Sequence, residues 1–365
     1  MTEKINTFQI TMLIILFQIG SAIVLGIGRD AGKASWIALL AGTVIGILFF
    51  FLYTLIYSLG KKSTMKDLLC FSFGKFVGSF LAFLYALYFF YISARVLGDF
   101  AFFIQNEFLT VSSFLVKVTL ILTIGYIAYL GIETLGRSGE VLFFITLIIL
   151  VPIFSFFFIS NTMDFHNLRP IREDLNKVMK ALYPLLITVP FGELVVFFTL
   201  FKYVDDFRTF IKRGWFGVLA SGFLLATVSV LTLGALSKEL VAEFNFPFVK
   251  AVQNINIEFL PHLEIIIIII FMIGGIIKIS IFFHGGIEIL STLFHIKNYK
   301  RLIIPVLFCI FFITIIFMKN YFEHITVGLK LVPYYLHFPF QIGIPLCMLV
   351  SLFVRNMLSK KNLSG

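Results

Sequence analysis

Residues 188–193 place a proline, a glycine and a carboxylate in the middle of an apolar stretch that runs from about Val178 to Phe201. A carboxylate near a bilayer centre costs roughly 2.5–3.5 kcal/mol on insertion scales, and proline removes a backbone hydrogen-bond donor. Interrupted backbone is tolerated at membrane depth only where it is buried in protein or lines a polar cavity. The sequence therefore predicts a ligand-binding site at this interruption. We expect one of its walls to be formed by Val189, Pro190, Phe191, Gly192 and Glu193.

A second interruption, Gly20-Ser21-Ala22, falls at a matching depth in the first apolar stretch. Paired interruptions are typical of inverted-repeat transporters, where exposed helix-end N–H and C=O groups bind a carboxylate and an ammonium. The pairing favours a site for a zwitterion such as an amino acid, with Gly20, Ser21 and Ala22 offering backbone groups. The alternative is that these small residues only let two helices approach closely.

Arg95 and Asp99 stand four positions apart in the third apolar stretch, so they share a helix face. We interpret them as a structural ion pair, because opposite charges neutralise each other in a low dielectric. Tyr91 lies one turn before Arg95, so this face can also supply an aromatic wall and a hydroxyl to a ligand.

Lys278 follows a Gly-Gly pair in the eighth apolar stretch. A buried lysine is costly unless it is paired, and Glu193 is the partner that we expect. Such an amine can accept and release protons and thereby couple a proton to substrate binding. The alternative is a lysine that snorkels to the membrane surface or is held by backbone carbonyls.

Composition excludes a soluble globular domain: the 365 residues are 60% hydrophobic and 13% charged, with a mean hydropathy of +1.03. We expect an all-α polytopic membrane protein, a single integral membrane domain over residues 1–365 with one repeat at about 7–160 and a second at about 178–356. Two sets of five helices then form an inverted repeat in which helices 1 and 6 are broken. The ten predicted transmembrane helices lie near 7–28, 34–59, 78–106, 112–131, 139–160, 178–201, 211–236, 261–290, 301–319 and 333–356.

The net charge of +10 comes from Lys and Arg that are spread over loops, without the basic arm of a nucleic-acid-binding protein. Their bias toward the side that holds the N-terminus predicts that both termini are cytoplasmic.

Cys70, Cys309 and Cys347 have no metal-ligand spacing, and no nucleophile, phosphate-loop or zinc motif is present. We therefore expect neither an enzyme nor a cofactor or metal site. Residues 246–259 predict a short amphipathic helix at the membrane interface, either a lid over the site or a surface helix.

Several short motifs, taken together and in order along nearly the whole chain, resemble the spore germination permease family, the B-type subunits of germinant receptors. They are Gln9, Gly20, Ala-Gly-Lys-Ala-Ser-Trp-Ile at 31–37, Arg137 with Glu140, Asn-Leu-Arg-Pro at 167–170, Pro-Phe-Gly-Glu at 190–193, and Glu258 with Glu264. Two positions depart from the family pattern. Ala34-Ser35 stands where an acidic residue often precedes the tryptophan, and Pro261-His262 stands where the family often has an arginine.

The resemblance implies a member of the amino acid–polyamine–organocation superfamily with the leucine-transporter fold, located in the spore inner membrane. It also implies an A-type membrane subunit and a C-type lipoprotein as partners, with a small nutrient as the ligand that ends dormancy. Two alternatives stay open. One is a proton-coupled amino acid permease that uses Lys278 or Glu193, and the other is a structural scaffold with a vestigial site.

Overall fold

The computed structural model describes residues 3–60, 64–107, 111–169, 175–256, 262–318 and 320–361. Within these ranges the chain is helical apart from turns and one isolated β-bridge between Ile5 and Val204. Ten helical segments in this part of the chain are long and apolar enough to cross a membrane. They are Thr7–Leu25, Arg29–Leu59, Lys75–Glu107, Ser113–Leu130, Ile132–Ile159, Leu175–Thr199, Phe207–Glu243, Glu264–Leu293, Tyr299–Phe317 and Pro333–Leu358. Each overlaps one of the predicted helices, so the number and order of spans are confirmed.

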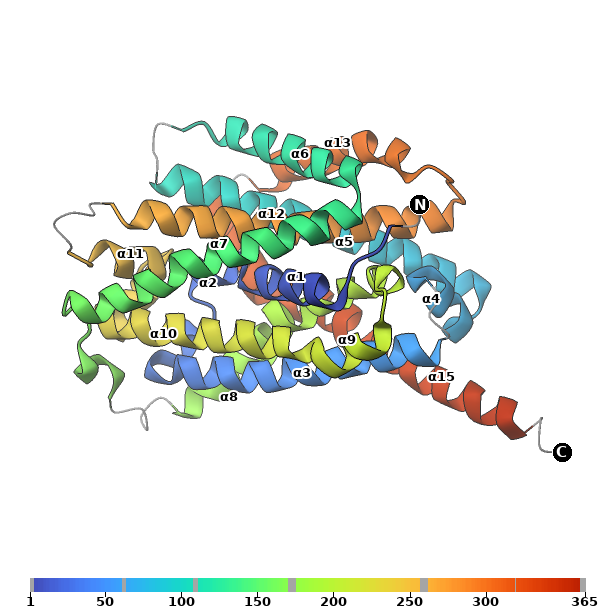
Figure 1. Cartoon of the computed structure of the whole chain (residues 1–365), viewed down its shortest axis with the longest axis horizontal. Helices are drawn as coiled ribbons and strands as arrows, with labels where there is room; N and C mark the ends of the chain where they lie inside the picture. The colour runs from blue at the N-terminus through green and yellow to red at the C-terminus, as the bar shows by residue number, and fades with distance from the viewer. Residues whose placement is uncertain are drawn as a thin grey trace.

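Five spans consist largely of one long helix, and they pack side by side in Figure 1. These are α5 (Lys75–Glu107), α6 (Ser113–Leu130), α7 (Ile132–Ile159), α12 (Glu264–Leu293) and α13 (Ile303–Phe317). The second span joins η1 (Arg29–Ala34) to α3 (Ser35–Leu59), and the seventh joins α9 (Phe207–Arg213) to α10 (Trp215–Glu243). The tenth contains the π-helical turns η9 (Pro333–His337) and η10 (Pro339–Gly343) before α15 (Ile344–Lys361).

The first and sixth spans are interrupted where the sequence predicts. In the first, α1 (Thr7–Ile19) ends at Gly20, whose φ of 2° and ψ of −117° are not helical, and α2 (Ala22–Leu25) follows. The sixth contains α8 (Val178–Ala181), η4 (Leu182–Phe191) and η5 (Gly192–Thr199), with extended backbone at Val189 (φ −123°, ψ 120°). The prediction of broken helices 1 and 6 is confirmed.

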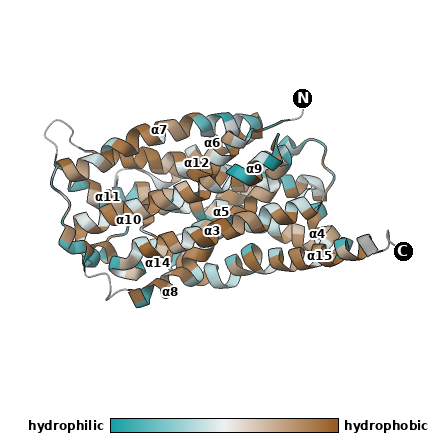
Figure 2. Ribbon diagram, turned by 60° about the horizontal axis from the view of Figure 1, so that its bottom comes forward, coloured by the Kyte–Doolittle hydropathy of each residue, from teal (hydrophilic) through white to brown (hydrophobic). Residues whose placement is uncertain are grey.

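These two broken spans lie inside the bundle. In each, 83% of the most apolar window is buried, compared with 22% for the fifth and ninth spans. Their interrupted backbone is therefore buried in protein, where its freed polar groups can find partners at membrane depth. The outer helices consist largely of hydrophobic residues, as the colours in Figure 2 show, and the chain is an integral membrane protein.

Shorter elements close the ends of the bundle. Both termini, α4 (Met65–Phe73) and α9 lie at one end, which we call the termini end, whereas α11 (Pro247–Gln253) and α14 (Tyr321–Thr326) lie at the opposite end (Figures 1 and 2). Helix α11 falls within the predicted 246–259 helix, and residues 257–259 of that prediction lie outside the described residues. Five of its seven residues are buried and it packs on α2 and α10, so α11 covers the end of the first span and is not a free surface helix.

Helices α5 and α12 pack closely because aromatic rings of α5 contact small residues of α12. A Cβ at Gly275 would lie 1.6 Å from Phe100 Cζ, and the rings of Phe100 and Phe271 stack with centroids 4.0 Å apart. Close approach over small residues is a common basis of helix association in membranes. These two helices therefore form a rigid support for the broken spans.

We expect Gly275→Val to destabilise the protein by about 1–3 kcal/mol, because the added methyl groups overpack the α5–α12 contact. The measurement is the melting temperature of the detergent-solubilised protein, followed by size-exclusion chromatography. Gly343→Ala is the matched control, since a Cβ there would meet its nearest heavy atom at an ordinary 3.9 Å. Equal melting temperatures for the two variants would contradict this packing.

Candidate functional site

A small cavity of about 50 Å³ lies between the two helix interruptions. It is lined by Ser21, Leu25, Ile27, Ile92, Arg95, Val96, Asp99, Val189, Glu193, Lys278, Ile325, Gly328, Leu329 and His337. Six of the residues singled out in the sequence are therefore brought together from the first span, α5, the sixth span and α12. These six are Ser21, Arg95, Asp99, Val189, Glu193 and Lys278.

The cavity contains a buried ion pair between the sixth span and α12. Lys278 Nζ lies 2.6 Å from Glu193 Oε2, and their side chains are 1% and 4% exposed. The lysine stem passes Gly20, where a Cβ would lie 3.2 Å from Lys278 Cδ, and Nζ lies 5.4 Å from the centroid of the Phe17 ring. The pairing expected from the sequence is present. Lys278 ends inside the protein, so the interpretation that it snorkels to the surface is wrong.

Arg95 and Asp99 do not pair with each other, and the predicted direct ion pair is wrong. His324 of α14 stands between them: its Nε2 lies 2.6 Å from Asp99 Oδ1, and Arg95 Nη2 donates to its backbone carbonyl at 2.6 Å. Arg95 also packs against Gly328, where any Cβ would overlap the guanidinium. The two residues share a helix face as expected, but a segment more than 200 positions later inserts between them.

This insertion makes α14 a cover over the cavity at the end opposite the termini. His324 is 2% exposed, and Ile325, Gly328 and Leu329 complete the wall. Burial and then the nearby Asp99 carboxylate raise the pKa of Tyr321, at the start of α14, to about 12. Its hydroxyl therefore stays protonated at physiological pH, and it adds no negative charge beside Asp99.

The tyrosine hydroxyl that contacts a lining residue of the cavity comes from Tyr88 and not from Tyr91. Tyr88 Oη lies 2.8 Å from Nδ1 of the cavity residue His337, and it accepts a hydrogen bond from Gln341 Nε2 at 2.8 Å. Tyr91 is half-buried, packs against the apolar core and does not line the cavity. The sequence spacing could have indicated Tyr88. It precedes Arg95 by seven residues, which is almost two full helical turns, so Tyr88 lies closer than Tyr91 to the helix face of Arg95.

Five predicted wall residues serve packing instead of lining the cavity. The Phe191 ring packs on Gly42 and Gly46 of α3, and Gly20 packs against Gly274 of α12. Gly192 directs its carbonyl to Tyr53 Oη, which donates to it at 3.2 Å. Pro190 is buried away from the cavity, and Ala22 lines a different cavity of about 30 Å³ next to α11. The interruption in the sixth span therefore contributes Val189 and Glu193 to the cavity, and that in the first span contributes Ser21.

The cavity is electrically balanced, with Arg95 and Lys278 opposite Asp99 and Glu193. Such a lining offers both hydrogen-bond donors and acceptors to a small polar molecule without a net charge of its own. Among the residues described, no group of three or more His, Cys, Asp or Glu is placed to hold a metal ion.

The ten spans of the described residues, of which the first and sixth are interrupted, define a membrane protein of the leucine-transporter fold with a 5+5 inverted repeat. A solved structure of Mhp1, a nucleobase-cation-symport-1 family transporter in a closed conformation with bromovinylhydantoin bound, matches with a TM-score of 0.63. It is 10% identical in sequence, and the match covers 86% of this chain and 72% of that one.

The chain belongs to the spore germination protein family, whose profile matches residues 4–323. It is 32% identical over 355 residues to spore germination protein KB of Bacillus subtilis (strain 168), covering 95% of this chain and 94% of the relative. It is also 22% identical over 275 residues to spore germination protein GerQB of Bacillus cereus, or 73% of each chain.

We expect Lys278→Met to destabilise the protein by about 3–5 kcal/mol, because it leaves the Glu193 carboxylate buried without a partner. The double variant Glu193→Gln/Lys278→Met removes both charges and should recover most of the loss in melting temperature. Arg137→Met is the control: it breaks an exposed pair with Glu133, whose side chains are 72% and 41% exposed, and such pairs contribute only about 0–1 kcal/mol. If Lys278→Met and Arg137→Met melt alike, the buried pair does not have the role described.

Proposed function

We propose that this chain is the nutrient-sensing B subunit of a spore germinant receptor, and that it binds a small nutrient such as an amino acid in the cavity between the broken spans. One observation carries the proposal: residues from both interruptions, Ser21, Val189 and Glu193, line the same small cavity as Lys278. Membership of the spore germination protein family supports the biological role. The proposed location is the spore inner membrane with both termini cytoplasmic, and the proposed partners are an A-type membrane subunit and a C-type lipoprotein.

The balance of charges favours a zwitterion over an ion. A ligand with a net charge would leave an uncompensated charge in a low dielectric, which is costly. The two charges of a zwitterion have complementary groups in the lining. Its carboxylate would be placed by Arg95 or Lys278, and its ammonium by Glu193 or Asp99. The volume of about 50 Å³ favours a small ligand or one whose entry widens the cavity.

Sensing requires that the ligand favour one packing of the broken spans over another. A ligand in this cavity would contact the first span, the sixth span, α5 and the α14 cover, which are separate pieces of the fold. Binding would therefore stabilise one relative arrangement of these segments over another. In our proposal the partner subunits respond to that shift.

A proton-coupled amino acid permease is the second candidate, and the Glu193–Lys278 pair favours it. Substrate that displaces one partner would leave the other to gain or lose a proton. The fold shared with a solved transporter is compatible with this function but shows the fold alone. Accumulation of labelled amino acid by proteoliposomes that contain only this chain would favour the permease.

Deletion of the gene should abolish or delay germination of purified spores toward at least one single nutrient, because the proposed receptor would lose its ligand-binding subunit. The measurement is the fall in optical density and the release of dipicolinic acid after each nutrient is added alone. Restoring the gene should restore the response. Unchanged germination toward every nutrient tested would overturn the receptor proposal.

Glu193→Gln should raise the nutrient concentration required for half-maximal germination by on the order of tenfold, which corresponds to about 1.4 kcal/mol of lost interaction. Gly20→Leu should do the same, since even a Cβ at this position would lie 3.2 Å from Lys278 Cδ and a longer side chain would displace the lysine. Glu133→Gln changes an exposed carboxylate and is the control. Immunoblots must show equal protein in the spores. A normal dose response from both site variants would place the ligand elsewhere.

A further inference from the structure

Helix α12 carries a second set of buried polar side chains outside the cavity. Ser280, His284 and Glu288 follow one another at intervals of four residues, and only 2%, 5% and 5% of their surfaces are exposed. Side chains at this spacing lie along one face of a helix. At 1.5 Å per residue the three cover about 12 Å along the axis. This polar column extends from the middle of α12 to the termini end.

Each member of the polar column has a buried atom with no hydrogen-bond partner among the described residues. These atoms are Ser280 Oγ, His284 Nε2 and Glu288 Oε2. A buried polar atom without a partner costs about 1–3 kcal/mol, and native proteins satisfy most such atoms, often with water. Three on successive turns of one helix face indicate a common small ligand rather than three separate defects.

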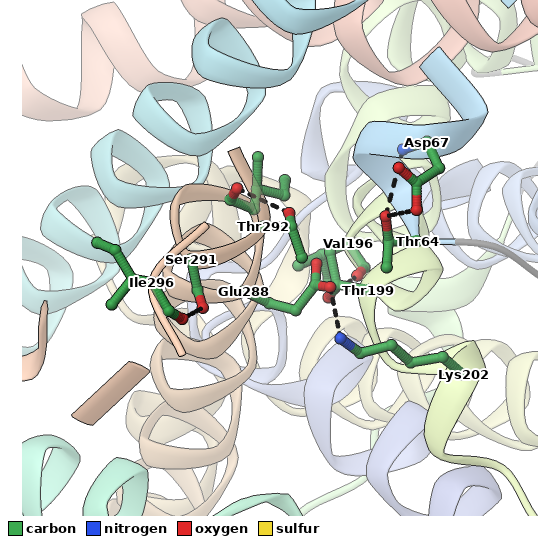
Figure 3. Close-up of polar contacts among 10 residues, drawn as sticks. Thr64, Asp67, Val196, Thr199, Lys202, Glu288, Ser291, Thr292 and Ile296 are labelled. Atoms are coloured by element: carbon green, nitrogen blue, oxygen red, sulfur yellow. Dashed lines mark hydrogen bonds and ion pairs between the residues drawn. The ribbon is translucent and has the colours of Figure 1, made fainter. Parts of the chain in front are cut away.

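The polar column opens toward water at the termini end. Glu288 Oε1 accepts a hydrogen bond from Lys202 Nζ at 2.6 Å, as Figure 3 shows, and the Lys202 side chain is 27% exposed. The His284 ring lies with its centroid 5.7 Å from that of Tyr203 and 6.1 Å from that of Tyr299. Charged groups therefore surround this end of the polar column, which we call its mouth. Lys202 lies on one side and Asp67 of α4 lies near Glu288. Glu3 Oε1 accepts a hydrogen bond from the Tyr299 hydroxyl at 3.5 Å.

The chemistry of the polar column selects its ligand. A metal ion or a second cation would be repelled by the Lys202 ammonium that already neutralises Glu288. An apolar molecule would leave the three atoms unsatisfied. Water both donates and accepts, so it can satisfy a hydroxyl, an imidazole nitrogen and a carboxylate oxygen in turn.

We propose that Ser280, His284 and Glu288 line a file of buried water molecules that opens beside Lys202 and exchanges protons between the aqueous phase at the termini end and the middle of α12. Each water passes a proton on by donating one hydrogen bond while it accepts another, and the imidazole accepts a proton at one nitrogen and releases one at the other. The net composition of the file is unchanged. Buried His and Glu in membrane spans often serve such relays. This proposal is independent of nutrient binding.

Cysteine reactivity tests whether water reaches the polar column. In a chain whose native Cys70, Cys309 and Cys347 are replaced by alanine, Ser280→Cys is compared with Ile279→Cys and Phe283→Cys, which replace neighbours that are 1% and 0% exposed. In phosphatidylglycerol vesicles, a small charged methanethiosulfonate should modify Ser280→Cys on the order of tenfold faster, because a charged reagent enters a hydrated face and not an apolar one. Equal rates at the three positions would overturn the proposal.

A second measurement asks whether the water enters beside Lys202. Glu288→Leu places an apolar side chain across the mouth and should reduce modification of Ser280→Cys. It should also slow the exchange of the His284 Cε1 hydrogen with D2O, which mass spectrometry measures on the otherwise native chain. Leu290→Ile, two residues further along, is the control for a general disturbance of α12. Unchanged cysteine modification and unchanged histidine exchange in Glu288→Leu, with a monodisperse elution profile, would show that no water file enters there.

Discussion

The ion pair between Glu193 and Lys278 is the constraint on which the rest of the fold depends. Two charges removed from water cost several kcal/mol each, and their attraction offsets this only if the geometry is tight and the surroundings stay ordered. Among the spans that the structure describes, the first and sixth are the most enclosed, and α5, α12 and α14 also line the cavity. The interruption at Gly20 has a steric consequence here. Its missing side chain leaves room for the lysine stem to pass α1 and reach the carboxylate.

Interrupted backbone at membrane depth must find new hydrogen-bond partners, and nearby side chains provide them. Tyr53 of α3 donates to the carbonyls of Gly192 at 3.2 Å and of Gln341 at 2.8 Å, and so joins the break in the sixth span to the π-helical part of the tenth. Thr188 Oγ1 donates to the carbonyl of Pro184 at 2.9 Å. The break in the sixth span is therefore braced by these hydrogen bonds, which keep its part of the cavity wall in place.

The sequence allowed the spans and the two interruptions to be predicted, because span length, proline, glycine and buried charge have strong local effects. The Glu193–Lys278 pair could also be predicted, because a buried charge needs an opposite charge and the spans contain few charged residues. The partner of Arg95 and Asp99 did not follow. His324 reaches them only because α14 folds back over the cavity, and that depends on tertiary packing. Phe191 and Gly192 were misplaced for a related reason: a helical period does not tell which way side chains point after a break.

Two ion pairs tie the second half of the sixth span and the turn that follows it to α12, and this determines which part of the site can move. Glu193 at the start of η5 pairs with Lys278, and Lys202 in η6 (Phe201–Tyr203) pairs with Glu288, ten residues further along α12. Helix α12 in turn packs on α5 through Gly275. A displacement of residues 192–203 would break both pairs at once, whereas a displacement of the first span would break neither. The first span is therefore the part of the cavity wall that can shift at the smaller electrostatic cost, since a shift of α14 would break the contacts of His324 with Asp99 and Arg95.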